Sequence, residues 1–417
     1  AEYTITNYGS TITFGRGATT GNRVDAQIYG TILNAFDPDN EDPETNRGEI
    51  VVNAYTTLSL YGTLTNDGFV SVNAAGTGVN GDDGTLNVYS DATLTNNHFV
   101  TIEGNMATQG TAFVNSQEGT FTVKVGAQIT GRGVVNDGGE YICEVNSVQR
   151  YEDAINNAKD AIHSTTLVRF IDTDTPSDMT YTLEGNTADN SITNKNGQVI
   201  NFESKMGDGV LLKLQNATND SGEPIPATIG KLTIVSGGFE LKHAALTMGE
   251  FEVNRESETS RWTSFQEKLT VTGDVNIVNN NHEGATDNYT FTKGVEVGGN
   301  MTVTDMSGEE IVFPEGIVSN IDGTLKIDKA TATFGKATEN NIGVNMEVTA
   351  NGDASFAANS VTTIQQAFIN DGEVSIIPQT MVGSGEVAAR VICRSFTNFG
   401  DKSHWLNGSY PQDTLSD

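Results

Sequence analysis

The clearest candidate for metal binding in this sequence is an acidic segment at positions 37–44. Within it, Asp37, Asp39 and Glu41 place carboxylates at alternate positions. Oxygen ligands of this kind suit a hard cation such as Ca²⁺, and carboxylates clustered so closely would repel one another without a counter-ion. The segment departs from the EF-hand loop, because it lacks the required glycine and the final bidentate glutamate. The sequence therefore leaves two interpretations open: a calcium site at these three residues, or a solvated acidic loop.

Three pairs of carboxylates are candidates for cleaving a glycosidic bond. They are Asp82 with Asp83, Asp172 with Asp174, and Glu309 with Glu310. Glycoside hydrolysis needs two carboxylates about 5–10 Å apart on either side of the bond. Adjacent residues of a strand point to opposite faces, so only Asp172 and Asp174 are spaced to share a face, and they lie in a loop-like run. No pair predicts a catalytic centre.

The remaining reactive side chains give no pattern of an enzyme either. The five histidines lie far apart and lack metal-ligand spacing. Cys143 and Cys393 each lie in an apolar, strand-like run, which favours two buried thiols over a disulfide. The chain has no nucleophile elbow, phosphate loop or dinucleotide fingerprint. We therefore expect no catalytic residue and no bound cofactor other than calcium.

Charge and composition exclude several classes of protein. The 417 residues include 23 Lys+Arg and 54 Asp+Glu, a formal net charge of −31 at pH 7. Nucleic acids and anionic membrane surfaces are bound by clustered basic residues, and the basic residues here are sparse and scattered. No stretch approaches the ~20 consecutive apolar residues of a membrane span. The start also lacks the pattern of a signal peptide, so Ala1 is expected to be a mature or trimmed N-terminus.

A repeated motif, apolar-x-Asn-x-Gly followed by alternating apolar residues, indicates the architecture. Its copies contain Asn7, Asn66, Asn96, Asn136, Asn370 and Asn398. Asparagine and glycine tolerate the positive φ angles that sharp turns between short strands need. In one copy His98 replaces the glycine, and histidine is among the residues enriched in left-handed conformations. We interpret the motif as a corner of the fold and not as a binding site.

A second motif, Gly-x-apolar-x-apolar, recurs at Gly48, Gly84 and Gly119. Spacing of this size is typical of stacked repeats, in which each unit needs a neighbour to bury its apolar face. The strands expected between turns are only three to five residues long, and helix signals are almost absent. Tandem β-sandwiches or a parallel β-helix would both fit an all-β chain. The short strands favour the parallel β-helix, or solenoid, in which aliphatic and asparagine columns run through successive coils.

One helix is expected at about 148–162. Ser147 occupies the N-cap position, and apolar residues recur at spacings of three and four along this segment. The helix would either cap the open end of a solenoid or simply connect two β domains. We place a first β-solenoid module at 1–145 and a second at 146–417, opened by the helix. A further break is expected near the charge-rich stretch 255–265.

The segment from Ser147 to Ala158 resembles the amphipathic N-terminal cap of right-handed parallel β-helices of the pectate-lyase-like class. The Leu-Thr-Asn-x-Gly-x-Val repeats are similar to those of large bacterial cell-surface proteins, including adhesins and surface-layer components. The resemblance covers residues 1–176 and, more weakly, 320–400, whereas 177–320 departs from the pattern with long polar insertions. It implies an exported protein built around a β-helix.

These observations predict a non-enzymatic extracellular protein of structural or adhesive type. It would be a rigid acidic β-rod, acting as a surface-layer, stalk or filament subunit through self-association into a homo-oligomer or polymer. Strong negative charge keeps such a rod soluble and is compatible with bridging by divalent cations. The first alternative is a polysaccharide-processing enzyme or glycan-binding β-helix. The second is a phage fibre or tailspike, which shares the architecture.

Overall fold

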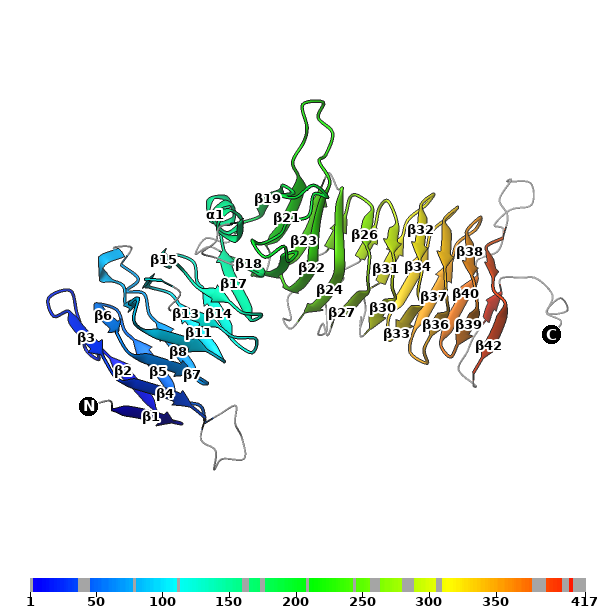
Figure 1. Cartoon of the computed structure of the whole chain (residues 1–417). Coiled ribbons are helices and arrows are strands. Elements are labelled where there is room, and N and C mark those ends of the chain that lie inside the picture. The colour runs from blue at the N-terminus through cyan, green and yellow to red at the C-terminus, as the bar shows by residue number, and fades with distance from the viewer. Residues whose placement is uncertain are drawn as a thin grey trace. The chain divides into compact units, whose positions relative to one another are not determined.

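The computed structural model describes residues 3–36, 46–77, 80–110, 113–159, 165–172, 177–207, 210–242, 245–255, 263–279, 289–304, 310–376, 388–399 and 405–407. The chain divides into two compact units (Figure 1). Unit 1 contains residues 1–169 and 193–200, and unit 2 contains residues 170–192 and 201–417. The predicted division into modules at 1–145 and 146–417 stays a prediction. Most of the predicted break at 255–265 lies outside the described residues.

Unit 1 is a three-sided coil in which every side is a stack of parallel strands. The first side contains β1 (Thr4–Tyr8), β4 (Thr31–Ala35), β7 (Thr63–Asn66), β10 (Thr93–Asn96), β13 (Phe113–Asn115) and β16 (Val135–Asn136). The second contains β2 (Thr11–Phe14), β5 (Glu49–Val52), β8 (Phe69–Val72), β11 (Phe99–Ile102), β14 (Thr120–Val123) and β17 (Glu140–Val145). The third contains β3 (Val24–Ile28), β6 (Thr56–Leu60), β9 (Thr85–Val88), β12 (Asn105–Thr108) and β15 (Gln128–Gly131). A short 3₁₀ turn, η1, covers Asn80–Asp82.

Strand alternation explains why so few apolar residues are enough for this core. In β7, Leu64 and Asn66 are buried while Thr63 and Thr65 are half-buried. The same pattern recurs in β10, whose Leu94 lies directly on Leu64. Because each inward residue meets its equivalent in the next coil, one narrow interior serves every strand. The predicted parallel β-helix is confirmed, and the tandem β-sandwich alternative is wrong because the paired strands are parallel.

Some Asn-x-Gly corners have the predicted glycine with a positive φ angle, whereas another requires glycine for a different physical reason. Gly9 has a φ of 56° and Gly138 a φ of 85°, as a left-handed turn requires. Gly68 does not have a positive φ, but a Cβ there would collide with the carbonyl oxygen of Gly48 in the coil beside it. His98 does not adopt a positive φ either. Close coil-to-coil approach, and not the turn dihedral, therefore explains the glycine at position 68.

The predicted helix is present as α1 (Val148–Lys159) and belongs to unit 1. The Oγ of Ser147 accepts a hydrogen bond from the backbone N–H of Arg150 at 3.2 Å, so the expected N-cap is confirmed. Tyr151, Ala154, Ile155 and Ala158 are buried and form the helix face that packs on β17. The helix thus covers the last coil of unit 1. The rest of the predicted helix, residues 160–162, lies outside the described residues.

Unit 2 begins within β18 (Leu167–Ile171), which straddles the division of the chain, and is also a parallel solenoid. One side contains β19 (Met179–Leu183), β21 (Leu211–Asn216), β23 (Gly238–Lys242), β25 (Thr263–Phe265), β28 (Tyr289–Phe291), β31 (Glu310–Phe313), β34 (Thr331–Phe334), β37 (Asp353–Phe356), β40 (Glu373–Ile376) and β43 (Trp405–Asn407). The other strands start from β20 (Asn201–Lys205) and the long β22 (Ala227–Ser236) and β24 (Leu246–Arg255), which pair in that order.

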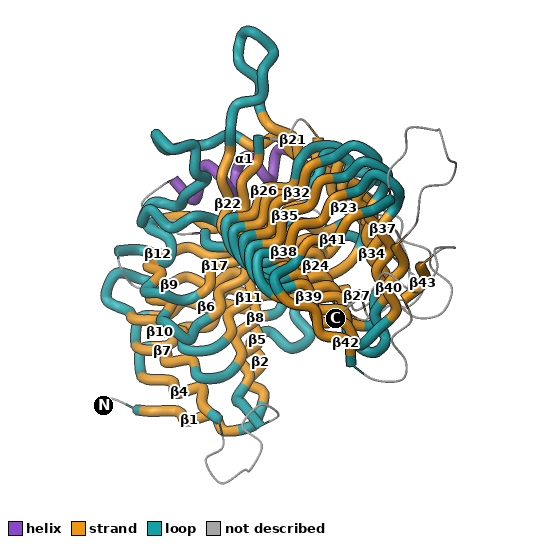
Figure 2. Tube along the Cα trace, turned by 90° about the vertical axis from the view of Figure 1, so that its right-hand side faces the viewer, coloured by secondary structure: helices purple, strands orange, loops and turns teal. Residues whose placement is uncertain are grey.

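Two stacks then continue from β24, since its two halves pair with two different strands. One is β26 (Leu269–Val271), β29 (Val295–Val297), β32 (Val318–Ile321), β35 (Glu339–Ile342), β38 (Val361–Ile364) and β41 (Arg390–Ile392). The other is β27 (Val275–Asn279), β30 (Met301–Thr304), β33 (Leu325–Asp328), β36 (Met346–Val348), β39 (Ala367–Asn370) and β42 (Ser395–Asn398). Figure 2 shows these coils lying one behind another. The described parts of positions 177–320, where the repeat motif is hard to see in the sequence, therefore belong to the coil.

A column of phenylalanine rings fills one wall of the unit 2 interior. It consists of Phe239, Phe265, Phe291, Phe313, Phe334 and Phe356. The last three rings are nearly parallel, with centroids 4.9 Å and 4.8 Å apart. All six side chains are buried. The ring separations match the spacing of hydrogen-bonded strands, so the rings stack because Phe334 and Phe356 are register partners in β34 and β37.

Candidate functional site

The predicted calcium ligands Asp37, Asp39 and Glu41 lie outside the described residues. Calcium binding at this segment therefore stays a prediction. Among the residues that the structure does describe, no three His, Cys, Asp or Glu side chains are grouped so that they could hold a metal ion. No helix in that part of the chain is long and apolar enough to cross a membrane.

Asp82 and Asp83 have structural partners. The carboxylate of Asp82 is buried and pairs with the guanidinium of Arg23 at 2.6 Å. Asp83 Oδ1 accepts a hydrogen bond from the backbone N–H of Ala75 at 2.7 Å. Both contacts hold the long turn around η1 against the coils of unit 1. These carboxylates stabilise a connection and do not converge on a cavity.

The other carboxylate candidates are separated in the same way. Asp172 accepts a hydrogen bond from the backbone N–H of Gly207. Glu310 accepts one from the hydroxyl of Thr333 at 2.8 Å, on the neighbouring strand. Asp174 and Glu309 lie outside the described residues. The carboxylates that can be placed thus link adjacent coils, as neutral polar side chains do elsewhere in the fold.

The two cysteines are free thiols. Cys143 is buried beneath α1, where its Sγ lies 3.4 Å from Thr165 Oγ1, and burial raises the pKa of its thiol. A cavity of about 400 Å³ adjoins it and is also lined by Tyr141 and Arg150. Burial also raises the pKa of Cys393, which is half-buried in the last coil. A protonated thiol is a weak nucleophile, so the cavity lacks the activated group that covalent chemistry needs.

The most regular polar feature of unit 1 is a ladder of asparagine side chains along its first side, buried except for the half-buried Asn136. Its members are Asn7, Asn34, Asn66, Asn96, Asn115 and Asn136. In the first five, Nδ2 donates to the Oδ1 of the next asparagine, over distances of 2.7–2.9 Å. Most of these amides also donate to a backbone carbonyl in the following coil, as Asn66 does to Phe99 at 3.0 Å. Asn34 and Asn115 belong to this ladder although their surroundings lack the full motif.

Core positions in the first described coil of unit 1 are more exposed than their equivalents in the next coil. Ile5 in β1 is 44% exposed, whereas Ile32, its partner in β4, is 3% exposed. Ile12 and Phe14 of β2 are likewise more exposed than their partners in β5. Among the described strands, β1 pairs only with β4. At the other end of unit 1, α1 packs on β17.

A core position in the last described coil of unit 2 shows a similar difference in exposure. Phe396 in β42 is 44% exposed, whereas Phe368, directly behind it in β39, is 1% exposed. Asn370 donates a hydrogen bond from Nδ2 to Oδ1 of Asn398 at 3.0 Å, which forms a second, short ladder. In the described part of the chain β42 pairs only with β39. We call β1 with its neighbours the N-terminal coil end, and β41 with β42 the C-terminal coil end.

An exposed tyrosine column on unit 1 was not anticipated from the sequence. Tyr29, Tyr61 and Tyr89 stack with ring centroids 4.8 Å and 4.2 Å apart. A hydrogen bond with Tyr89, together with partial burial, raises the pKa of Tyr61 to about 12. The recurrence of tyrosine at intervals of 32 and 28 residues, just before a turn, was the available signal. Its rings lie against one another, so the column adds coil-to-coil contact on the outside of the unit.

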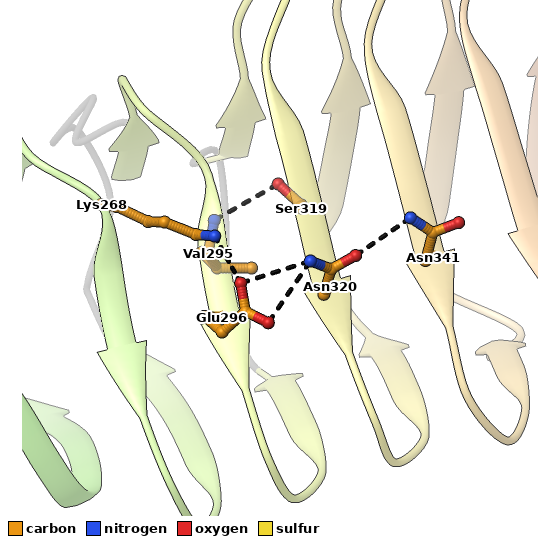
Figure 3. A network of polar contacts seen from close by, with 6 residues as sticks. All are labelled: Lys268, Val295, Glu296, Ser319, Asn320 and Asn341. Carbon is orange, nitrogen blue, oxygen red and sulfur yellow. Dashed lines mark hydrogen bonds and ion pairs between the residues drawn. The ribbon is translucent and has the colours of Figure 1, made fainter.

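Unit 2 carries an outer polar column of its own, shown in Figure 3. Lys268 pairs with Glu296, whose carboxylate accepts hydrogen bonds from Nδ2 of Asn320 at 3.3 Å and 3.2 Å. Asn320 in turn accepts a hydrogen bond from Nδ2 of Asn341 at 2.9 Å. The bonds with Lys268 and Asn320 lower the pKa of Glu296. The column therefore joins four coils and leaves no convergent group for catalysis among these residues.

No protein-family model, curated protein or solved structure matches this chain. The stacked parallel sheets and the asparagine ladder support the predicted resemblance only as far as a parallel β-solenoid.

Proposed function

We propose that this protein is a non-enzymatic extracellular structural or adhesive protein that acts as a surface-layer, stalk or filament subunit through self-association. The observation that carries the proposal is the solenoid architecture: each unit is a stack of parallel coils joined by columns of buried side chains. In such a stack each coil contacts only its neighbours, so a rigid scaffold needs no ligand or reactive site, and edge strands of β structures can template pairing with another chain.

The disposition of charged and reactive groups supports the same proposal. The candidate carboxylates that the structure places, Asp82, Asp83, Asp172 and Glu310, bind an arginine, backbone amides or a hydroxyl. A net charge of −31 would keep separate subunits apart at low ionic strength. Screening by salt, or bridging by Ca²⁺, would then permit association. The finer assignment, an adhesin or surface-layer protein of pectate-lyase-like type, belongs to this proposal.

Sedimentation velocity of the purified chain over a wide concentration range, in low salt, in high salt and with Ca²⁺, tests the proposal. We expect a mass that increases with concentration and with ionic strength, and elongated assemblies in negative-stain images of the same samples. A discrete trimer at all concentrations would favour a fibre or tailspike. Depolymerisation of an acidic polysaccharide would contradict the non-enzymatic assignment. A monomer under every condition would exclude self-association.

A further inference from the structure

The strands on the first side of unit 1 carry no charge. None of the residues in these six strands is acidic or basic, although the whole chain has a net charge of −31. Every other stack of described strands contains at least one charged residue. Asp67, Asp91 and Asp137 lie in turns at the borders of the first side. Two acidic chains repel each other least where the facing surfaces are uncharged, so this side is the most favourable one for contact between copies.

The outward side chains of this side form two columns of register partners. The first column contains Thr4, Thr31, Thr63 and Thr93. The second contains Thr6, Leu33, Thr65, Thr95, Val114 and Val135. We call the residues of these two columns the threonine face, and all of them are half-buried or exposed. Threonine and valine have a restricted χ1 angle, so packing them against another surface costs little side-chain entropy.

The tyrosine column of Tyr29, Tyr61 and Tyr89 lies next to the threonine face. Tyr29 and Tyr61 each precede a threonine of the first column by two residues, and Tyr29 is 63% exposed. Tyrosine is enriched where proteins contact one another. From the usual strand dimensions, the face and this column together extend about 24 Å along the stack and about 20 Å along the strands. Two such surfaces in contact would bury roughly 1,000 Å² in total, which is the lower limit for a specific interface.

We propose that two copies of this chain associate side by side through their threonine faces. The same face serves in both copies, so the contact is isologous, with the two parallel sheets packed against each other. Leu33, Val114, Val135 and the threonine methyl groups supply apolar contact. Threonine hydroxyls hydrogen-bond across the interface, as they do between neighbouring strands of a sheet. The inference rests on the proposed function, because it specifies one surface through which self-association occurs.

A charge near the middle of the face tests the contact. Thr65→Asp places a carboxylate there in both copies, so the dissociation constant should rise by about 10-fold or more. Thr101→Asp is the matched control, because Thr101 is also the half-buried third residue of its strand but belongs to the second side. It adds the same charge and should associate as the native chain does. Sedimentation velocity over a range of concentrations, at one salt concentration, measures both variants.

Two further samples separate a lost contact from a lost fold. An equimolar mixture of Thr65→Asp with Thr65→Lys should restore association, because an isologous contact brings the opposite charges together. Thr65→Val keeps the shape of the side chain and removes a hydroxyl that the contact would bury. It should associate at least as tightly as the native chain. A misfolded Thr65→Asp chain would not be rescued by the mixture.

Thiol protection locates the contact directly. In a Cys393→Ser background the remaining native thiol is Cys143, which is buried. The thiol introduced by Thr65→Cys should react more slowly with a maleimide as the protein concentration rises, because association covers it. The thiol introduced by Thr101→Cys should react at the same rate at every concentration. Equal protection of the two thiols would contradict a contact through the threonine face.

The outcomes separate this inference from the proposed function. Native association that Thr65→Asp weakens and Thr101→Asp does not weaken supports both. Native association that the two variants weaken equally, or that neither weakens, overturns the threonine face and leaves self-association standing. Weakening by Thr65→Asp without rescue by the mixture overturns the isologous contact, because the face would then meet a different surface of the neighbouring copy. A native chain that stays monomeric overturns both.

Discussion

The interior of unit 1 contains a column of amides, whereas the interior of unit 2 contains a column of aromatic rings. Asn66 lies between Asn34 and Asn96 with hydrogen bonds of 2.7 Å and 2.8 Å. Phe334 lies between Phe313 and Phe356 with centroids 4.9 Å and 4.8 Å apart. Both columns repeat once per coil and both are buried. Directional bonds accept only one side chain at each position, while apolar contacts accept any side chain of similar size.

The largest effect is expected from shortening a ring in the aromatic column. Phe334→Ala should lower the free energy of unfolding by about 3–5 kcal/mol, because it removes contacts with both neighbouring rings and leaves a cavity. Phe334→Leu should cost only roughly 1–2 kcal/mol, since an apolar side chain still fills the space. Urea unfolding of the full chain, with hydrogen exchange to localise the loss to β34 and β37, measures both. Equal losses for the two variants would mean that ring stacking itself is required.

In the amide column, by contrast, an apolar side chain should not replace asparagine at a small loss of stability. Asn66→Leu should cost about 2–4 kcal/mol, because it removes partners from Asn34, Asn96 and a buried backbone carbonyl. Asn97→Leu changes the half-buried residue that follows Asn96 and serves as the control. It should lower the free energy of unfolding by less than about 1 kcal/mol. Hydrogen exchange in β7 and β10 checks the prediction. If Asn66→Leu were as mild as Phe334→Leu, the two columns would be equivalent and the comparison would fail.

The difference between the columns also explains what the sequence could predict. Asn66 and Asn370 occur in a motif with glycine and flanking apolar residues, so local chemistry alone indicated a corner and a solenoid. Asn34 has no glycine two positions later, and its place in the ladder became evident only from its register with Asn7. The phenylalanine column has no motif, because any large apolar residue suits its positions. The sequence predicted self-association through solenoid ends and edge strands, but it did not show how exposed each core position would be, since the 44% exposure of Ile5 follows from the pairing of its strand.

A smaller effect is expected where the amide ladder reaches a coil end. Asn398→Ala removes one partly buried hydrogen bond, with Asn370, and should lower the free energy of unfolding of the monomer by about 1 kcal/mol. Replacing Asn66 should lower the free energy of unfolding more than replacing Asn398, because Asn66 is buried. Thermal unfolding at low protein concentration measures this cost without assembly. A loss as large as that of Asn66→Leu would show that the C-terminal coil end is already covered within the monomer.

The smallest expected effect concerns the outer face of the strands that carry the aromatic column. Burial, and then the charge of Glu373 on the next strand, raise the pKa of Asp353. The folded state therefore holds this proton more tightly than the unfolded state, and its contribution to stability is lost as pH rises from about 4 through the raised pKa. Asp353→Asn should thus be more stable than the native chain at pH 7, by up to about 0.5 kcal/mol. The advantage should vanish near pH 3, whereas Ser355→Asn, outward on the same strand, should show no pH-dependent difference. A constant advantage at both pH values would assign the effect to packing on the outer face and not to carboxylate repulsion.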